Sequence, residues 1–544
     1  MHRAQQLATL ATKSFDLCII GGGASGAGAA LDAALRGYSV CLIEKEDFAA
    51  DTSSRSTKLI HGGVRYLEQA FKKLDLAQLK QVRHGLSERR ILLDLAPHLA
   101  RPLPILTPVR SYVELLYYAI GLKLYGWFAR HDKLPKSKAL SRAEALRRMP
   151  TLSKARTYGA VLYYDGQLDD ARYCLALAQA AAEEGACVLN HITLTGFEKD
   201  ARDRLQTALL SDQLSGAQYQ VQARFFLNCT GPAADTIRQM ANSAAIARIR
   251  PSKGVHAVLP GAVLQSEHAM LIPKTPDGRV IFAIPYEGAV LLGTTDTPYE
   301  SRAQEPLLEA AELDYLIETL QPYLSETVDK RHLKAGFAGV RPLISASGNK
   351  STKRLLRDHE VEYEAQSGLL SLLGGKWTTY RLMAKDAVDQ FELLYKNTIS
   401  ACKTDTYLLP GATDFKNVDA STVATALEVP LRVATHLCDK YGSRVLAFAA
   451  LLEKDSSGRN LLHSEHPYIA AEVQYAVEQE MACTLRDFLA RRIRLEITDW
   501  QAAHDTAPAV ALIMGKLLHW SESKTQQETA DYQALIRHFQ NMIQ

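Results

Sequence analysis

Residues 16–44 constrain the fold of this chain more than any other stretch. Residues 17–20 are an apolar run that predicts a buried strand, and three consecutive glycines then require a sharp turn. Small and apolar residues follow and predict a buried helix, and a second strand comes after it. Gly21, Gly23 and Gly26 have the G-x-G-x-x-G spacing. This order of strand, glycine turn, helix and strand is typical of a dinucleotide-binding βαβ unit.

Each part of this unit can contact a dinucleotide. Gly23 lets the backbone approach a pyrophosphate, and Gly26 lets the helix pack closely against the strand. The N-terminus of the helix offers N–H groups and the positive end of a dipole to the phosphates. Glu44 ends the second strand, where a carboxylate accepts hydrogen bonds from an adenosine ribose. The motif does not separate NAD from FAD, and the alternative is a glycine turn without a ligand.

Size and composition indicate an ordinary globular protein. The 544 residues exceed what one hydrophobic core usually organises, so two or three domains are expected. A formal net charge of +3 gives no argument for a nucleic-acid partner. The eight cysteines form no CxxC motif, and several lie in apolar runs. We therefore expect core cysteines of a reducing compartment, with neither disulfides nor a metal site.

The first fourteen residues contain His2, Arg3 and Lys13 but no acid. They lack a sustained apolar region, so we expect a disordered N-terminal extension rather than the remnant of a targeting peptide. No secretory signal is evident.

A polar loop follows Glu44 at residues 51–68. Its hydroxyl groups can bond phosphate or flavin edges, and Lys58, His61 and Arg65 add donors nearby. The alternative is a solvated Ser/Thr loop that caps the next helix. The hydroxyl residues are Thr52, Ser53, Ser54, Ser56 and Thr57.

Two neighbouring segments have unusual composition. Residues 71–104 have helical spacing, and residues 112–129 are apolar and aromatic but short for a bilayer span. Residues 130–156 then hold nine basic residues and two acids. Aromatic rings beside a basic tract suit a segment bound at a lipid surface without spanning it. The alternative is a buried helix followed by a solvated basic loop.

The central part of the chain alternates strands and helices. Residues 220–229 predict a buried strand that runs into Thr230 and Gly231. Residues 250–345 contain short apolar runs separated by Gly and Pro, which predict a mostly antiparallel inserted sheet with His256 on its first strand.

Cationic residues gather after this sheet. A phosphate monoester accepts paired guanidinium hydrogen bonds, so arginines that converge from different strands suit it better than flexible lysines.

Gly374 and Gly375 make a second turn before a helix predicted to start near Thr378. The N-terminus of this helix can stabilise negative charge on a bound ring.

The combination of motifs identifies a family resemblance. GGGASGAG, TSSRSTKLIHGGVRYLE, APHLARPLP, YYDGQLDDARY, NCTGPAAD, LLGTTDT, GVRPL and GGKWTTYR occur in this order. In order and separation they resemble the FAD-dependent glycerol-3-phosphate dehydrogenases, membrane-associated flavoproteins that feed a quinone pool. The resemblance runs from about Asp16 to the C-terminus.

The resemblance implies an α/β protein with three parts. A Rossmann-like FAD-binding domain of glutathione-reductase type covers residues 16–398, mainly 16–110, 157–250 and 340–398. An antiparallel-sheet substrate domain is inserted into it, mainly at 111–156 and 251–339. Residues 1–15 are the N-terminal extension, and residues 399–544 have helical spacing and form a C-terminal domain without a catalytic role. No DxDxDG loop is present, so we expect no calcium-binding extension like that of the animal relatives.

The resemblance also implies site residues. Arg341 and Arg357 are expected to bind the substrate phosphate. His256 is the expected base, with His61 as its rival, and no dedicated base is needed if neighbouring cations stabilise the alkoxide. The substrate residues are Arg65, Tyr66, His256, Arg341, Arg357, Lys376 and Thr379, of which Arg65, His256 and Lys376, with His61, are the catalytic candidates. The cofactor residues are Gly21, Gly23, Ala24, Ser25, Gly26, Glu44, Lys45, Thr52, Ser53, Ser54, Ser56, Lys58, His61, Gly62, Gly63, Thr230, Gly231, Asp296, Arg341, Gly375, Lys376, Trp377 and Thr378.

The implied reaction is oxidation of sn-glycerol 3-phosphate to dihydroxyacetone phosphate, with hydride transfer to FAD and electron transfer to a quinone. An oxygen-reducing oxidase of the same family and a non-catalytic flavin-bound scaffold are the alternatives. The implied location is the cytoplasm, peripheral on the inner face of the cytoplasmic membrane. A homodimer is a possible assembly that the resemblance does not decide.

Overall fold

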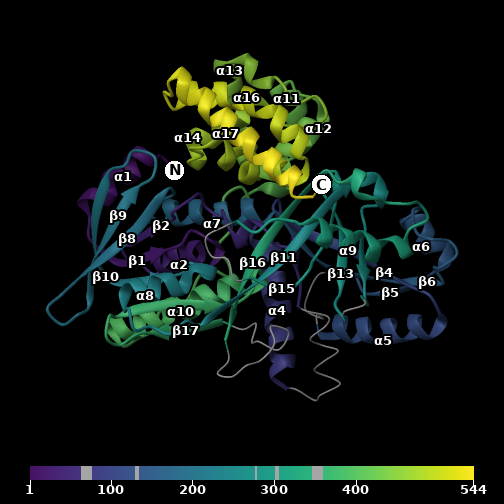
Figure 1. The fold of residues 1–544 in the computed structure, drawn as a ribbon, viewed down its shortest axis with the longest axis horizontal. Coiled ribbons are helices and arrows are strands. Elements are labelled where there is room, and N and C mark those ends of the chain that lie inside the picture. The colour runs from purple at the N-terminus through teal and green to yellow at the C-terminus, as the bar shows by residue number, and fades with distance from the viewer. Residues whose placement is uncertain (63–75, 129–133, 276–277, 300–304, 346–358, 544) are drawn as a thin grey trace.

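The computed structural model describes residues 1–62, 76–128, 134–275, 278–299, 305–345 and 359–543. Within these residues the chain forms two large sheets, with helices around them and a helical C-terminal part above (Figure 1). The C-terminal helices, yellow and olive in the figure, cover the region where the two sheets meet.

The first sheet is the nucleotide-binding sheet predicted from the glycine motif. Its described strands follow the order β17-β18-β10-β1-β2-β7, and β1, β2, β7, β10 and β18 are mutually parallel. Parallel pairing buries both faces, which explains why β1 is apolar on both sides. The strands are β1 Phe15–Ile20, β2 Val40–Ile43, β7 Cys187–Leu189, β8 Ile192–Lys199, β9 Leu205–Asp212, β10 Gln218–Asn228, β17 His359–Tyr363 and β18 Leu369–Gly374.

Several helices pack against this sheet. Helix α2 (Ala24–Leu35) connects β1 to β2 and lies between α7 (Asp170–Glu183) and α10 (Tyr380–Lys396). Ten of its twelve residues are buried because nearly all of them are Ala, Gly or Leu. The second predicted helix starts at Tyr380, after the 3₁₀ turn η7 (Trp377–Thr379), and so begins two residues later than expected.

The second sheet is mostly antiparallel and forms the cap. Its described strands run in the order β15-β11-β14-β13-β12-β4-β6-β3, with β16 added beside β11 and β5 beside β6. The strands are β3 Leu59–Ile60, β4 Ala100–Val109, β5 Lys138–Ser141, β6 Gly159–Leu168, β11 Ile249–Pro260, β12 Ala269–Ile272, β13 Ile281–Tyr286, β14 Ala289–Gly293, β15 Thr297–Pro298 and β16 Ala335–Ile344.

Two assignments of the sequence analysis need correction here. Strands β4 and β6 pair along ten residues each and belong to the second sheet, whereas residues 16–110 and 157–250 were placed with the FAD-binding domain. The helix predicted over 71–104 is confined to α4 (Leu76–Leu95) in the described residues. Pro102, Pro104 and Pro108 exclude a continued helix, because proline lacks the N–H that a helix interior needs.

The N-terminal residues are also ordered, against expectation. Helix α1 (Arg3–Thr12) buries Leu10, which is 1 % exposed. Arg3 Nη2 lies 2.6 Å from Asp212 Oδ1, and the amino group of Met1 donates to the carbonyl of Gln479 at 2.9 Å. Apolar packing, ion pairs and hydrogen bonds, such as the one from Val188 N to Gln6 Oε1 at 3.1 Å, hold this segment, and none of them requires a long apolar run.

The remaining helices cover the cap or form the C-terminal part. The cap carries α5 (Tyr112–Phe128), α6 (Arg142–Arg148) and α9 (Ala310–Leu320), and α8 (Ala234–Ala241) follows β10. The C-terminal helices are α11 (Ala420–Leu427), α12 (Leu431–Tyr441), α13 (Ala447–Lys454), α14 (Ala470–Glu480), α15 (Leu495–Thr498), α16 (Trp500–Leu517) and α17 (Glu522–Asn541). A π-helical turn, η11 (Asp487–Arg492), lies between α14 and α15.

Candidate active site

The glycine turn after β1 depends on the absence of side chains. Gly21 has φ +108°, and a Cβ there would lie 2.7 Å from the carbonyl oxygen of Cys229. A Cβ on Gly26 would lie 1.9 Å from the carbonyl oxygen of Gly21. The backbone of β1, the end of β10 and the start of α2 therefore approach one another as closely as glycine permits. Gly23 is the N-cap of α2, and because it has no side chain, Ser53 of the loop after β2 approaches the first turn of the helix.

Glu44 braces this turn from the end of β2. Its Oε2 accepts from Gly22 N at 2.6 Å, and its Oε1 accepts from Glu46 N at 2.9 Å. Burial raises the pKa of this carboxyl group to about 7 despite these two bonds. Its neighbour Lys45 points to solvent, with a side chain 63 % exposed, and pairs with Glu46. The ribose contact of Glu44 stays a prediction.

The predicted hydroxyl loop joins the two sheets. Thr52, which begins the 3₁₀ turn η1 (Thr52–Ser54), donates from Oγ1 to the carbonyl of Val340 on β16 at 2.6 Å. Ser53 Oγ accepts from Ala24 N at 3.0 Å, and the Ser53 carbonyl accepts from Trp377 Nε1 at 2.8 Å. The loop thus contacts the first turn of α2, the turn after β18 and the cap.

Two other residues of this loop bond inside the protein. The ammonium group of Lys58 is fully buried and donates to the Ser54 carbonyl and to Asp170 Oδ2, each at 2.7 Å. Burial lowers the pKa of Lys58 to about 7, and Arg494 nearby lowers it further. Ser56 donates to the same Asp170 oxygen from N and Oγ. These donors, predicted to face a cofactor, shape the loop around Asp170.

One face of the second sheet carries the predicted base. His256 on β11 is 2 % exposed, and its Nε2 lies 3.0 Å from Thr57 Oγ1. Its ring stacks on Phe337 of β16 with centroids 4.8 Å apart. Burial lowers the pKa of His256 well below 6.5, and the positive charges of Lys58 and Arg341 lower it further. The ring is therefore neutral at pH 7, and its buried Nδ1 has no hydrogen-bond partner among the described residues.

Arg341 lies on the same face, four residues after Phe337. A Cβ on Gly254 would lie 2.4 Å from its Nη2, so the guanidinium group crosses β11 where there is no side chain. Nη2 donates to Thr294 Oγ1 and to the carbonyl of Thr295, each at 3.2 Å. Nη1 lies 3.5 Å from Asp296 Oδ1. Asp296 therefore contacts the predicted phosphate-binding arginine.

The remaining predicted positions lie at the ends of parallel strands. Strand β10 ends beside Thr230 and Gly231, and β18 ends in Gly374, next to Gly375. These ends and the Gly21 turn belong to the neighbouring parallel strands β18, β10 and β1, so they share one edge of the first sheet.

The turn after β18 also reaches the hydroxyl loop. Thr378 Oγ1 accepts from His61 N at 3.4 Å, and Thr379 Oγ1 donates to the Lys376 carbonyl at 3.2 Å. Gly62 N donates to Tyr125 OH at 2.9 Å. Gly63, Arg65, Tyr66 and Arg357 lie outside the described residues, and their predicted roles stay predictions.

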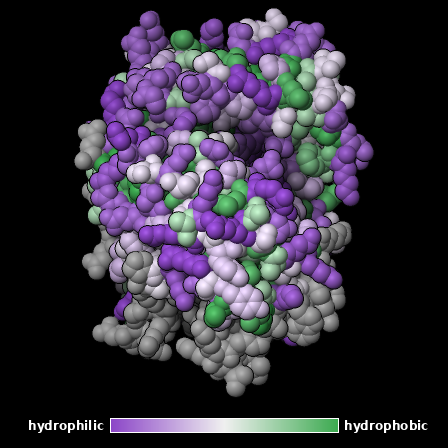
Figure 2. Space-filling view, turned by 90° about the vertical axis from the view of Figure 1, so that its right-hand side faces the viewer, coloured by the Kyte–Doolittle hydropathy of each residue, from purple (hydrophilic) through white to green (hydrophobic). Residues whose placement is uncertain are grey.

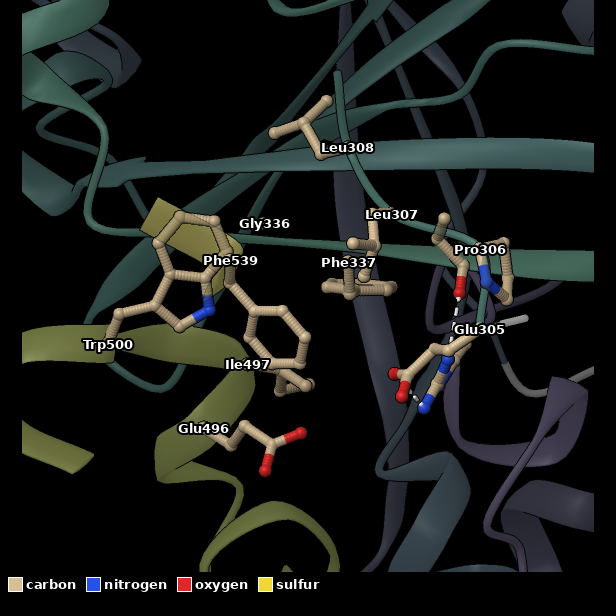
Figure 3. Close-up of a pocket in the computed structure, with 12 residues that line it drawn as sticks. Glu305, Pro306, Leu307, Leu308, Gly336, Phe337, Glu496, Ile497, Trp500 and Phe539 are labelled. Carbon is tan, nitrogen blue, oxygen red and sulfur yellow. Dashed lines mark hydrogen bonds and ion pairs between the residues drawn. The ribbon is translucent and has the colours of Figure 1, made fainter. Parts of the chain in front are cut away.

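A separate hollow lies behind Phe337, between the cap and the C-terminal helices (Figure 3). Its free volume, with the open mouth included, is about 360 Å³. Trp500 and Phe539 face Leu307 and Phe337 across it, and Glu305 lies at one end. No residue predicted to bind substrate or cofactor lines this hollow, so the candidate site lies on the other side of Phe337, around His256.

Comparisons with known proteins agree with this geometry. Residues 16–381 match the family of FAD dependent oxidoreductases, and residues 402–525 match the C-terminal domain of alpha-glycerophosphate oxidase. The chain is 39% identical over 538 residues to a mitochondrial glycerol-3-phosphate dehydrogenase of Mesocricetus auratus, covering 97% of this chain and 74% of the relative. A probable mitochondrial glycerol-3-phosphate dehydrogenase of Caenorhabditis elegans is 40% identical over 528 residues, covering 95% and 73%.

The chain belongs to the FAD-dependent glycerol-3-phosphate dehydrogenase family. The solved structure of the glycerol-3-phosphate dehydrogenase from Bacillus halodurans, complexed with FAD, superimposes with a TM-score of 0.79 at 28% identity, covering 98% of this chain and 97% of that one. The predicted family, mixed α/β fold and FAD cofactor are thereby confirmed.

Three features of the structure fit FAD. Gly21, Gly23 and Gly26 place no side chain at the turn into α2, where a pyrophosphate binds in such units. The ends of β1, β10 and β18 form the edge where dinucleotides bind in such sheets. His256 Nδ1 is a buried polar atom that a bound group can satisfy.

Some residues that shape the site received no role from the sequence. Phe337 stacks on His256 and has no local pattern that marks it. Asp170 holds the hydroxyl loop and stands in the YYDGQLDDARY motif, but it was not among the predicted site residues. For Arg494, which also contacts Asp170, the sequence does contain a signal. Four arginines and two acids, Asp487 and Glu496, interrupt an apolar stretch at residues 485–497, and charges inside an apolar run indicate buried ion pairs.

Proposed function

We propose that this protein oxidises sn-glycerol 3-phosphate to dihydroxyacetone phosphate and passes the electrons to a quinone. The observation that carries the proposal is the shared sheet face of Arg341 and His256, which lies against the loop that caps α2. An anion bound at Arg341 then lies close to a neutral imidazole and to the dinucleotide edge. Family membership supports the same reaction.

In this proposal Arg341 and Arg357 bind the phosphate, and Arg65, His256 and Lys376 contact the glycerol hydroxyls, with Tyr66 and Thr379 as companions. Guanidinium groups suit a phosphate because they donate paired hydrogen bonds. When bound, FAD supplies the two-electron acceptor that takes the hydride from C2 at its N5 atom. The protein holds C2–H toward that atom and receives the hydroxyl proton.

His256 is the proposed proton acceptor. A neutral imidazole has a free lone pair, so the lowered pKa keeps His256 ready to accept. The lowered pKa also makes His256 a weak base. A substrate phosphate beside Arg341 offsets one of the positive charges that lower this pKa, so substrate binding makes His256 more basic. His61 stays the rival, since its backbone N–H contacts Thr378 in the same region.

Electron transfer to a lipid-soluble quinone requires contact with a membrane, and α5 supplies a suitable surface. Along its outer side five large apolar residues are 47–75 % exposed, while Leu122 and Tyr125 on the inner side are buried. Basic residues exposed on and after the neighbouring α6 can meet anionic lipid. The exposed apolar residues of α5 are Tyr112, Val113, Leu116, Tyr117 and Ile120.

The surface around α5 and α6 mixes the two kinds of residue. Figure 2 views the molecule from the side on which these helices lie and shows hydrophobic residues gathered among hydrophilic ones toward its lower part. Within the described residues, no helix combines the length and apolar character needed to cross a bilayer. We therefore propose peripheral attachment, on the inner face of the cytoplasmic membrane, and leave a homodimer as a prediction.

An oxygen-reducing oxidase is the second candidate, because residues 402–525 match a domain described from alpha-glycerophosphate oxidase. Anaerobic mixing of the FAD-loaded protein with glycerol 3-phosphate tests the oxidation. The yellow absorbance is expected to bleach, and glycerol without phosphate, as the control, is expected to leave it unchanged. Persistent colour with glycerol 3-phosphate would instead support a flavin-bound scaffold. Faster re-oxidation by a quinone analogue than by air identifies a dehydrogenase, and the reverse order identifies an oxidase.

A further inference from the structure

The C-terminal domain reaches the active-site loop through one buried arginine. Arg494 follows the π-helical turn η11 and has φ +67°, a left-handed conformation that is uncommon for a residue with a long side chain. π-Helical turns occur often at functional sites, and backbone strain is retained where the surroundings require it. The strained turn directs the Arg494 side chain out of its own domain.

The guanidinium group of Arg494 is fully buried and has partners in three parts of the fold. Nη2 donates to the carbonyl of Ser54 at 2.7 Å and to Asp170 Oδ1 at 2.9 Å. Nε lies 3.4 Å from the hydroxyl of Tyr286, which ends β13 of the cap. One side chain from the C-terminal domain thus contacts the hydroxyl loop, the start of α7 and the cap sheet.

Asp170 connects Arg494 to the hydroxyl loop. Its Oδ1 accepts from Arg494, and its Oδ2 accepts from Lys58 and Ser56. The Ser54 carbonyl is shared in the same way between Arg494 and Lys58. Two buried cations therefore hold one carboxylate and one loop carbonyl, and a buried carboxylate left with a single cation is costly.

We propose that Arg494 is a positioning residue of the active site: through Ser54 and Asp170 it fixes the loop of residues 52–58. In that geometry Thr57 lies against His256 and Ser53 lies against the first turn of α2. The C-terminal domain, for which the sequence analysis expected no catalytic role, takes part in the reaction through this loop. The inference deepens the proposed function and rests on it only for the kinetic measurement.

The test compares Arg494→Gln and Arg494→Lys with a matched control. Arg492→Gln also removes a buried arginine, two residues before Arg494, but Arg492 contacts Asp47 and Glu480, and among the described residues no hydrogen bond joins it to the loop. Trypsin cleavage after Arg55 or Lys58 in the FAD-loaded proteins, followed by mass spectrometry, reports how firmly the loop is held. FAD content, kcat and KM for glycerol 3-phosphate are measured in parallel.

For Arg494→Gln we expect cleavage at these two bonds to rise roughly tenfold or more, and kcat to fall by about tenfold with a smaller change in KM. Arg494→Lys keeps the charge but loses the Nε contact with Tyr286 and the Nη1 bond to the Ala490 carbonyl, so its cleavage and kcat are expected to lie between those of Arg494→Gln and the wild type. Arg492→Gln is expected to keep wild-type cleavage and kcat.

Wild-type cleavage and kcat in both Arg494 variants would overturn the proposal, as would equal changes in the Arg492→Gln control. If Arg494→Gln does not fold, Arg494→Lys decides by the same measurements. If the wild type leaves glycerol 3-phosphate unoxidised, the proposed function fails, but the cleavage comparison still decides the role of Arg494.

Discussion

Thr57 and His256 join the two sheets of the molecule, since Thr57 Oγ1 lies 3.0 Å from His256 Nε2. Thr57 comes from the loop that caps α2, and His256 comes from the cap strand β11. The contact with Thr57 fixes the imidazole ring in one of the two orientations that keep its stacking on Phe337 and that differ by a half rotation about the Cβ–Cγ bond. It thereby determines which ring nitrogen is available to a substrate.

This contact predicts non-additive mutations. If His256 is the base, His256→Gln is expected to lower kcat by roughly 10²–10⁴-fold. Thr57→Val alone is expected to lower kcat less, because it only releases the ring. In the double variant the two losses are not expected to add, with a coupling of about 0.5–3 kcal/mol from a double-mutant cycle of kcat values. Additive losses would show that Thr57 and His256 act separately.

Arg341 is predicted to decide substrate capture. Arg341→Ala is expected to weaken transition-state binding by roughly 2–5 kcal/mol in kcat/KM, because it removes a charged partner in a partly desolvated pocket. FAD content is expected to stay at wild-type level. Arg331→Ala, at a side chain that is 88 % exposed, is the control and should leave kcat/KM unchanged. Loss of flavin in Arg341→Ala would mean that Arg341 holds the cofactor.

The glycine turn predicts a loss of cofactor without a general loss of fold. A Cβ at Gly23 would lie 2.9 Å from Ser53 Oγ, so Gly23→Val pushes side-chain atoms into the space between the loop and α2. We expect FAD absorbance to be lost from the purified protein. Gly121→Ala, in α5, meets no atom within 4 Å and should retain stoichiometric FAD. Retention of FAD by Gly23→Val would contradict the assigned pyrophosphate site.

The exposed side of α5 predicts membrane binding. Val113→Glu and Ile120→Glu are expected to reduce co-sedimentation with anionic vesicles by about tenfold or more, because each places a charge where apolar area would enter the lipid. Leu512→Glu changes a leucine that is 61 % exposed on α16 and serves as the control. Equal binding by all three variants and the wild type would exclude α5 as the attachment surface.

His98 predicts a loss of stability in acid. Burial lowers its pKa to about 3, and the charges of Arg172 and Arg444 lower it further. The folded protein therefore keeps His98 neutral, whereas the unfolded chain protonates it below about pH 6.5. Stability contributed by the neutral form is complete above pH 6.5 and is lost as the pH falls toward 3, by about 2 kcal/mol at pH 5.

Urea denaturation of the wild type and of His98→Gln at pH 7.5 and pH 5 measures this contribution. Other titrating groups are shared by the two proteins and cancel in the difference. Between pH 7.5 and pH 5, the free energy of unfolding should fall by about 2 kcal/mol less in His98→Gln than in the wild type. A parallel fall in both proteins would show that His98 is protonated in the folded state.

The sequence by itself determined the local units. The glycine spacing at 21–26 predicts the turn because steric exclusion acts between neighbouring residues, and the structure has that turn at the predicted place. The parallel strands β1, β2 and β10 were also predictable, since burial on both faces requires a continuous apolar run. The helical spacing after residue 399 likewise gave the C-terminal part.

Only the tertiary structure decided which polar groups pair. Lys58 was predicted to face a ligand because it lies among other donors of the loop, yet its partner is Asp170, which lies 112 residues away in the sequence. Arg494 contacts Ser54 across 440 residues, and the placement of β4 in the cap follows from pairing with β6. Hydrogen bonds and ion pairs depend on distance in space. Their partners become neighbours only when the hydrophobic cores bring the sheets and the C-terminal helices together.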